Sequence, residues 1–158
     1  MVGSPTPGRE AAFKDFVESA SLYLTRTAFL LCGNEDTAHD LVQETLVRTY
    51  AAWWRVRRSD ARAYARRVLV NLNVDRYRRP PAVPTELAEG ADARDAERRV
   101  DDRDEVRRML ASLAPQQRRV IVLRYFDDLP EAEVAECLGI SVGSVKSSCS
   151  RGLAALRA

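Results

Sequence analysis

The chain has 158 residues, of which 46% are hydrophobic, and carries a net charge of +2. This length suits one domain or two small ones, and the hydrophobic content argues against a chain that is disordered throughout. With a single histidine, His39, a zinc site or a His-based catalytic triad has almost no material. No apolar stretch approaches the roughly 20 residues that span a membrane, and the N-terminus lacks the pattern of a signal peptide. We therefore expect a cytoplasmic protein with no metal, no cofactor and no membrane segment.

Charge is distributed unevenly along the chain. Residues 55–79 contain nine arginines and two aspartates, which gives this stretch a net charge of +7. Residues 80–104 contain eight acidic residues and four arginines, a net charge of −4. Opposite charge blocks side by side predict a basic binding surface followed by an acidic connector.

The first half of the chain predicts three helices after a flexible tail, residues 1–10. Apolar residues mark one face of a long helix that Gly33 ends: Phe13, Phe16, Val17, Ala20, Leu24, Ala28 and Leu31. Asn34 can cap a second helix, whose core face is Ala38, Leu41, Val42, Thr45 and Thr49 and runs on towards Trp53. A third helix is predicted from about residue 61 to 78, and its core-facing residues are Tyr64, Val68, Leu69 and Leu72.

Two surfaces of these helices carry polar groups of interest. On the second helix Asp40 and Glu44 are like charges four residues apart, which costs an isolated helix a few tenths of a kcal/mol, and Gln43 lies beside them. A solvated acidic face is the plain interpretation. A basic loop at residues 55–60 precedes the third helix, on which we expect these arginines to be exposed: Arg62, Arg66, Arg67 and Arg76. Cations beside aromatic rings suit phosphate contact and stacking on unpaired bases, although Trp53, Trp54 and Tyr64 are equally compatible with a core.

Two prolines, Pro80 and Pro81, end the third helix, and Pro84 keeps the next stretch extended. Residues 80–100 are acidic and show little apolar periodicity, so they are predicted to form a flexible linker. About twenty residues reach at most ~65–70 Å. That length is enough to connect two separate contacts on one nucleic acid.

The last segment, residues 101–158, predicts four helices. The first begins near Asp101 with an apolar face of Val106, Met109, Leu110 and Leu113. The second opens at Pro115 and ends near Asp127. The final pair has the start and stop signals of a helix-turn-helix: Pro130 starts one helix, Gly139 ends it, and Ser141 caps the next. Small residues at Ala135 and Gly139 are expected to let the two helices cross closely.

The last predicted helix sorts its residues by face. One side is apolar and is expected to pack on the preceding helix: Val145, Cys149, Leu153 and Leu156. The other side is polar, near the end that enters a DNA major groove: Lys146, Ser147, Ser150 and Arg151. A solvated polar face explains many single helices, but the cap, the glycine turn and the divided faces together favour DNA binding.

Several of these stretches resemble bacterial sigma factors. The string Asp40-Leu41-Val42-Gln43-Glu44 resembles the family's most characteristic motif, on the helix that grips the clamp of RNA polymerase. Residues 68–79 are similar to the segment that opens the −10 promoter element. Residues 113–125 and 138–147 resemble sigma domain 4. The chain has no room for the extra domains of a primary sigma factor. It is therefore identified as a member of the extracytoplasmic-function (ECF) type, similar to the actinobacterial sigma-E-like group.

This resemblance implies an all-α fold of two small helical domains, sigma domain 2 at residues 11–79 and sigma domain 4 at residues 101–158. It implies core-polymerase contacts at Asp40, Gln43 and Glu44, and −35 contacts at the four polar residues of the last helix. The implied −10 contacts are Arg57, Arg58, Arg67, Asn71 and Arg76, with Asn71 at the position that meets an extruded base. Such a protein is a specificity subunit rather than an enzyme, binds core RNA polymerase and promoter DNA, is monomeric when free, and has an anti-sigma factor as a further implied partner.

Two other functions fit part of the sequence. A stand-alone helix-turn-helix regulator, with the first half as a dimer or ligand module, leaves the acidic Asp40 and Glu44 face and the split charge map unexplained. An arginine-rich enzyme acting on nucleic acid lacks a convincing catalytic group, because Asp127 and Asp128 are neighbours in a predicted turn. Neither accounts for both halves of the chain.

Overall fold

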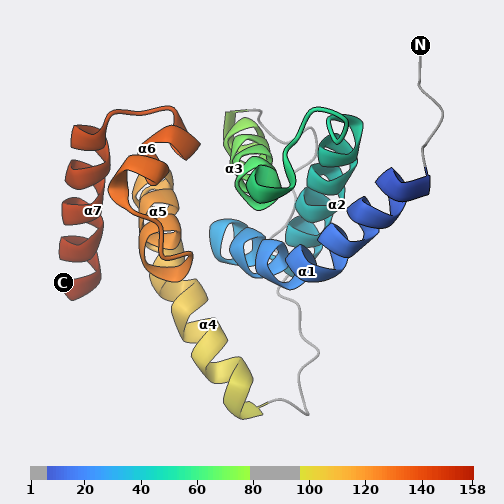
Figure 1. The fold of residues 1–158 in the computed structure, drawn as a ribbon. Helices are drawn as coiled ribbons and strands as arrows, with labels where there is room; N and C mark the ends of the chain where they lie inside the picture. Colours follow the sequence, from blue (N-terminus) through green and yellow to red (C-terminus); the bar gives the residue numbers. More distant parts are fainter. Residues whose placement is uncertain (1–6, 79–96) are drawn as a thin grey trace. The chain divides into compact units, whose positions relative to one another are not determined.

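The computed structural model describes residues 7–78 and 97–158, with the side chains of 7–78 and 102–158. All regular structure in these two ranges is helical (Figure 1). The chain divides into two compact units, Met1–Asn73 and Val74–Ala158, and we describe each by itself. Most of the predicted acidic linker lies outside the described residues.

The first unit is built from three helices: α1 (Pro7–Cys32), α2 (Glu35–Ala51) and α3 (Ala61–Arg78), the last of which runs past the division at Asn73. Helix α1 begins at Pro7, earlier than the tail predicted for residues 1–10 allowed. Gly33 ends it with a positive φ of 70°, a conformation that glycine adopts without steric cost. Asn34 then caps α2, its side-chain oxygen accepting a 2.9 Å hydrogen bond from the Thr37 amide. Both predicted signals at this corner are confirmed.

The core of the first unit joins all three helices. Each contributes three buried residues: Ala20, Leu24 and Ala28 from α1, Ala38, Leu41 and Val42 from α2, and Ala65, Leu69 and Leu72 from α3. Four of the nine are alanines, whose small side chains suit close approach of the helices. Thr45 and Thr49 are also buried, and their hydroxyls donate to backbone carbonyls one turn earlier, at 2.7 Å in both cases. The predicted core face of α2 is confirmed in full.

Two arginines of α3 hold that helix against α1. The guanidinium of Arg66 donates to the Tyr23 hydroxyl at 3.1 Å. Arg62 lies 4.8 Å from the centre of the Tyr23 ring and donates to the Ser19 carbonyl at 3.3 Å. Arg66 is consequently half-buried, so the expectation that it projects freely from α3 is wrong. The reason is a tyrosine 43 positions away in the sequence.

Aromatic rings connect the start of α1 to the end of α2. Phe13 packs on Tyr50 and on Trp53, with ring centres 4.9 Å and 5.2 Å apart, and Phe16 packs on Trp53 at 5.3 Å. Trp53 is 7% exposed whereas Trp54 is 70% exposed. A core role therefore holds for the first tryptophan and not for the second.

The second unit contains α4 (Glu97–Ala111), α5 (Pro115–Ile121), a π-helical turn η2 (Val122–Phe126), α6 (Glu131–Leu138) and α7 (Val142–Arg157). Leu110 and Leu113 are buried at the end of α4, as predicted, but Met109 is 43% exposed and does not belong to the core. Arg118 of α5 satisfies the last carbonyls of α4, donating to those of Leu110 at 2.8 Å and Ala111 at 3.2 Å.

The segment between α5 and α6 is a π-helical turn, which the sequence did not predict. The Asp127 amide donates to the Val122 carbonyl at 3.0 Å, a bond spanning five residues. Asp128 follows with a positive φ of 55°, and the Leu129 amide returns to the Leu123 carbonyl at 3.1 Å. The second predicted helix of this unit thus ends near Asp127, as expected, but its last turn is π-helical.

The helix-turn-helix forms at α6 and α7. Pro130 is the N-cap of α6 rather than its first helical residue. Gly139 ends α6 with a φ of 65°, and the Ser141 hydroxyl accepts a 3.0 Å bond from the Ser144 amide at the start of α7. No atom lies within 4 Å of where a Cβ on Gly139 would stand, so this glycine is needed for its backbone angle and not for a close crossing.

The close helix approach lies instead at Gly152, on α7. A Cβ added there would stand 3.1 Å from Cγ1 of Ile121, on α5. Val145 is fully buried, whereas Cys149, Leu153 and Leu156 are half-buried. The predicted apolar side of α7 exists, but α7 packs on α5 as well as on α6.

Candidate functional site

The acidic face of α2 is exposed along its length. Asp40, Gln43 and Glu44 all point to solvent, and the adjacent Leu41 and Val42 are buried. Glu44 is not an uncompensated charge: its carboxylate accepts a 2.8 Å hydrogen bond from Arg48 Nε, with both side chains about half exposed. The face therefore combines one repulsive neighbour, Asp40, with one attractive neighbour four residues further on.

The five residues predicted to contact −10 DNA are exposed, and they do not all share one face. Arg67 and Asn71 are one turn apart on α3, so they lie on the same side of the helix. Arg57 and Arg58 precede α3, the second of them opening the short η1 turn (Arg58–Asp60). Arg76 lies five residues beyond Asn71, about 140° further around the helix at 3.6 residues per turn.

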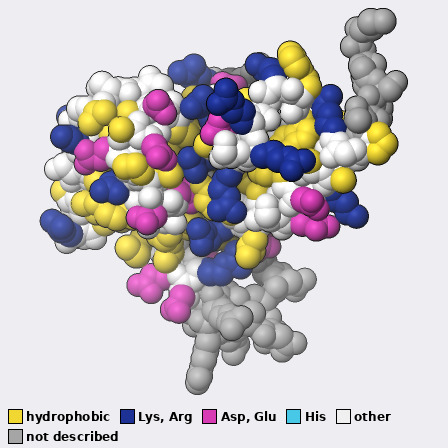
Figure 2. Space-filling model, viewed as in Figure 1, with side chains coloured by type: hydrophobic (Ala, Val, Ile, Leu, Met, Phe, Trp, Pro, Cys, Tyr) yellow, Lys and Arg dark blue, Asp and Glu magenta, His cyan; other side chains and the backbone are white. Residues whose placement is uncertain are grey.

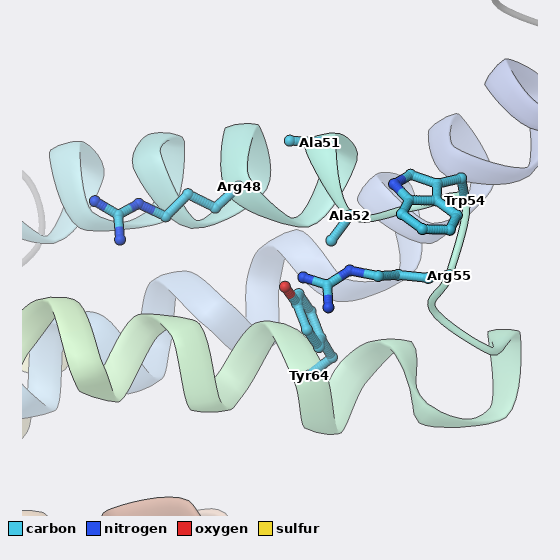
Figure 3. A pocket seen from close by; sticks show the side chains of 6 residues that line it. All are labelled: Arg48, Ala51, Ala52, Trp54, Arg55 and Tyr64. Carbon is cyan, nitrogen blue, oxygen red and sulfur yellow. The ribbon is translucent and has the colours of Figure 1, made fainter. Parts of the chain in front are cut away.

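An open hollow lies between the end of α2, the loop that follows and the start of α3 (Figure 3). It measures about 450 Å³, and its lining residues are Arg48, Ala51, Ala52, Trp54, Arg55 and Tyr64. In Figure 3 the guanidinium of Arg55 extends from the loop towards the Tyr64 ring of α3. A second hollow of about 330 Å³ shares Arg55 and Tyr64 and adds Arg57. Aromatic rings and guanidinium groups around open space suit an unpaired base and its phosphate.

Basic groups are spread among apolar ones on the surface that Figure 2 presents, where dark-blue Lys and Arg side chains stand beside yellow hydrophobic ones. Large apolar side chains are exposed in each unit taken by itself: Val47, Tyr50 and Trp54 in the first, and Tyr77, Tyr125 and Phe126 in the second. This mixture suits a partner that offers both phosphate charge and ring faces.

The polar side of α7 is exposed as predicted. Lys146, Ser147, Ser150 and Arg151 are all at the surface, in the half of the helix nearer its N-terminus. Lys146 is not isolated, because its Nζ lies 3.9 Å from a carboxylate oxygen of Glu131, the first residue of α6. The helix thus presents donors and hydroxyls to solvent along one arc.

One further side chain reaches α7 from the π turn. The hydroxyl of Tyr125 is 3.5 Å from Cys149 Sγ, and Tyr125 is 53% exposed. The hydrogen bond with Cys149 raises the pKa of Tyr125 above its ordinary value of 10.0, with partial burial as the second cause. The phenol is therefore neutral at physiological pH, and its hydroxyl stands at the edge of the exposed arc.

The described part of the chain contains neither a candidate metal cluster nor a candidate membrane-spanning helix. In residues 7–78 and 102–158 no three His, Cys, Asp or Glu side chains gather into a group that could hold a metal ion. Within the same ranges, no helix combines the length and the apolar character needed to cross a bilayer.

Comparisons with known proteins decide the family. Residues 16–80 match the family described as Sigma-70 region 2, and residues 103–156 match Sigma-70, region 4. The chain is 38% identical over 155 residues to the RNA polymerase sigma-E factor of Streptomyces avermitilis. The aligned region covers 95% of this chain and 86% of that protein. The chain belongs to the RNA polymerase sigma factors. It is of the ECF type, as the resemblance predicted.

Two more distant relatives agree with this assignment. The ECF RNA polymerase sigma factor SigW of Bacillus subtilis is 29% identical over 168 residues, covering 95% of this chain and 89% of that one. Among solved structures, CnrH in complex with the cytosolic domain of CnrY has a TM-score of 0.71 at 27% identity, covering 94% of this chain and 86% of CnrH. This sigma factor binds core RNA polymerase and promoter DNA and directs transcription initiation, so a stand-alone regulator is not favoured.

Sequence reasoning named Trp54 as a ring for stacking or for the core and placed Arg55 in a basic loop, but it did not predict the hollow that both residues line in this sigma factor. It also overlooked Glu131 and Tyr125, whose contacts with α7 come from the preceding elements. Those contacts depend on tertiary structure and leave no local pattern.

Proposed function

We propose that three exposed surfaces divide the work of promoter recognition in this sigma factor. Asp40, Gln43 and Glu44 bind core RNA polymerase. The exposed side of α3, with the loop before it, captures the melted −10 element. The polar arc of α7 reads the −35 duplex. The chain contributes binding and positioning, and the polymerase carries out the chemistry, so the protein itself is not an enzyme.

The observation that carries this proposal is the division of α7. Its buried side is used against α5 and α6, at Val145 and Gly152, and its capped N-terminal half leaves four polar side chains exposed. A recognition helix contacts base edges in the major groove with residues near its N-terminus. Arg151 has the planar fork that bonds a guanine bidentately, whereas Lys146 is a point charge able to contact a base or a phosphate.

The −10 surface is supported by the hollow beside α3. A base extruded from the duplex loses its stacking and pairing, which costs a few kcal/mol unless the protein replaces them. Tyr64 and Trp54 offer ring faces, and the amide of Asn71 offers one donor and one acceptor group for a base edge. Arg57 and Arg67 supply charge for the phosphates on either side. In this proposal the hollow accommodates the extruded base, and Asn71 distinguishes which base it is.

Further partners follow from the family. The chain acts where core polymerase and promoter DNA are found, in the cytoplasm, and it is monomeric when free. An anti-sigma factor is the implied regulatory partner, and the complex of CnrH with a second protein's cytosolic domain agrees with partner binding in a related fold. Size measurement of the free chain tests the monomer directly.

The −35 assignment is tested by transcription from promoters randomised across that element. Holoenzyme made with Arg151→Ala is compared with wild type and with Arg157→Ala, a matched exposed arginine in the last turn of α7. If Arg151 reads a guanine, its loss costs about 1–3 kcal/mol and relaxes preference at one base pair. A uniform loss of activity, with a salt slope lower by about one charge, would reduce its role to phosphate contact. Unchanged activity would reject DNA contact by Arg151.

A further inference from the structure

Lys146 forms an ion pair with an acidic residue, Glu131, that has no direct role in the proposed contact with DNA. Its Nζ lies 3.9 Å from Glu131 Oε2, and the two side chains are 65% and 36% exposed. Glu131 is the first residue of α6, on the preceding helix of the motif. A carboxylate beside a DNA-binding surface repels phosphate, so its presence lowers affinity unless it contributes something else. Exposed ion pairs add little to the stability of a protein, so stability alone does not explain why this pair is present.

We propose that Glu131 is a positioning residue that directs Lys146 to a base edge and keeps it from the phosphate backbone, an inference that rests on the proposed −35 function of α7. Lysine carries a compact charge on a flexible four-carbon stem, so nothing in its own geometry prefers a base to a phosphate. The carboxylate of Glu131, on the first residue of α6, attracts the ammonium to one side. It also cancels the charge that phosphates attract.

The surroundings of Lys146 support this restraint. Cys149 lies three residues along α7, on the same side of the helix, and the Tyr125 hydroxyl reaches it at 3.5 Å. The 3.9 Å contact with Lys146 places the Glu131 carboxylate near this side, and its charge is the smallest of the effects on the pKa of Tyr125, which the hydrogen bond to Cys149 chiefly raises. Tyr125 and Glu131 thus approach one side of α7 from the two elements before it.

A simpler explanation is that Glu131 serves only α6. An acidic residue in the first turn of a helix is stabilised by the helix dipole with no need of a lysine. This explanation predicts that removing the carboxylate changes stability slightly and leaves the reading of DNA unchanged. The positioning role predicts a change in specificity and in salt dependence, neither of which follows from a loss at the helix terminus.

The experiment compares holoenzymes carrying wild-type, Glu131→Gln and Glu136→Gln sigma factor on promoter fragments randomised across the −35 element. Glu136 is an exposed acid on the same helix, so Glu136→Gln removes the same charge without touching the pair. For Glu131→Gln we expect discrimination at one base pair to fall by up to about fivefold, because an exposed ion pair holds its lysine only weakly. We also expect the salt dependence of binding to steepen by about one charge, because the released lysine neutralises one more phosphate.

A double substitution links the effect to the lysine. In the Lys146→Gln background, Glu131→Gln should change neither discrimination nor salt slope. An effect that persists there would overturn the proposal, because Glu131 would then act on DNA directly. Identical behaviour of Glu131→Gln and Glu136→Gln would overturn it as well.

Failure of this inference can be told apart from failure of the −35 assignment. If Lys146→Gln and Arg151→Ala both leave promoter selection unchanged, the assignment of α7 fails and the positioning role fails with it. If those two variants alter selection while Glu131→Gln matches Glu136→Gln, α7 reads DNA and only the role of Glu131 is refuted.

Discussion

Charge reversal at Glu44 tests the proposed polymerase contact, because the structure predicts that it leaves the free protein almost unchanged. Glu44→Lys removes the ion pair with Arg48 and replaces it with a repulsion over the same spacing. It also removes the repulsion from Asp40 and replaces it with an attraction. Each pair four residues apart on an exposed helix is worth about 0.2–0.5 kcal/mol, so the two losses and two gains cancel to within roughly 0.5 kcal/mol.

The interface behaves differently, since a partner that accepts Glu44 presents positive charge or donors to it. Like-charge juxtaposition across an interface costs several kcal/mol, and each 1.4 kcal/mol is a factor of ten in affinity. We therefore expect Glu44→Lys to weaken binding to core polymerase by about 100-fold or more. The measurement is a titration of labelled sigma factor with core polymerase, together with thermal unfolding of the free chain.

Glu18→Lys is the matched control for this experiment, because Glu18 is an exposed acid on a different helix, α1. It should bind core polymerase as wild type does. A folded Glu44→Lys protein with full affinity for core polymerase would refute the assignment of this face. A large drop in thermal stability would refute the cancellation of the helix pairs and leave the binding loss without a specific cause.

Asn71→Ala should leave core binding intact and impair open-complex formation, because alanine cannot replace the donor and acceptor that offset the unstacking of a base. Permanganate reactivity of the −10 thymines reports the melting, and wild-type reactivity would count against a base contact. Gly139→Ala should destabilise the chain by about 1–2 kcal/mol, since nothing crowds the site and the cost comes from the left-handed backbone. Gly143→Ala, inside α7 with its nearest neighbour at 3.8 Å, should instead stabilise by up to about 1 kcal/mol, and denaturant unfolding compares the two signs.

Local chemistry explains which parts of the fold the sequence could predict. Asn34 and Ser141 cap their helices through backbone amides three residues away, and Gly33 and Gly139 end theirs through their own backbone angles. Signals of this kind are complete within a few residues. The exposed arc of α7 was predictable for a related reason, because its spacing alone separates buried positions from exposed ones.

Contacts between distant residues explain what the sequence left out. Arg66 is taken from the surface by Tyr23, and α7 rests on α5 because Gly152 faces Ile121. The π turn at Val122–Phe126 inserts one residue into the helical repeat, which periodicity cannot register in so short a segment. The ion pair of Glu44 could have been predicted from the sequence, since Arg48 follows Glu44 by four residues just as Asp40 precedes it by four.

The Glu44–Arg48 pair also connects the two surfaces of the first unit. Arg48 lines the hollow that contains Trp54 and Tyr64, while its partner carboxylate belongs to the face proposed for core polymerase. An exposed pair of this kind is worth at most about 1 kcal/mol, so a partner that binds Glu44 separates it at little cost. In Figure 3 the Arg48 side chain extends along α2, away from Trp54 and Tyr64, and a guanidinium released from Glu44 is free to turn towards the hollow. Binding of polymerase to α2 and attraction of a phosphate to the hollow are therefore expected to favour one another through this one arginine.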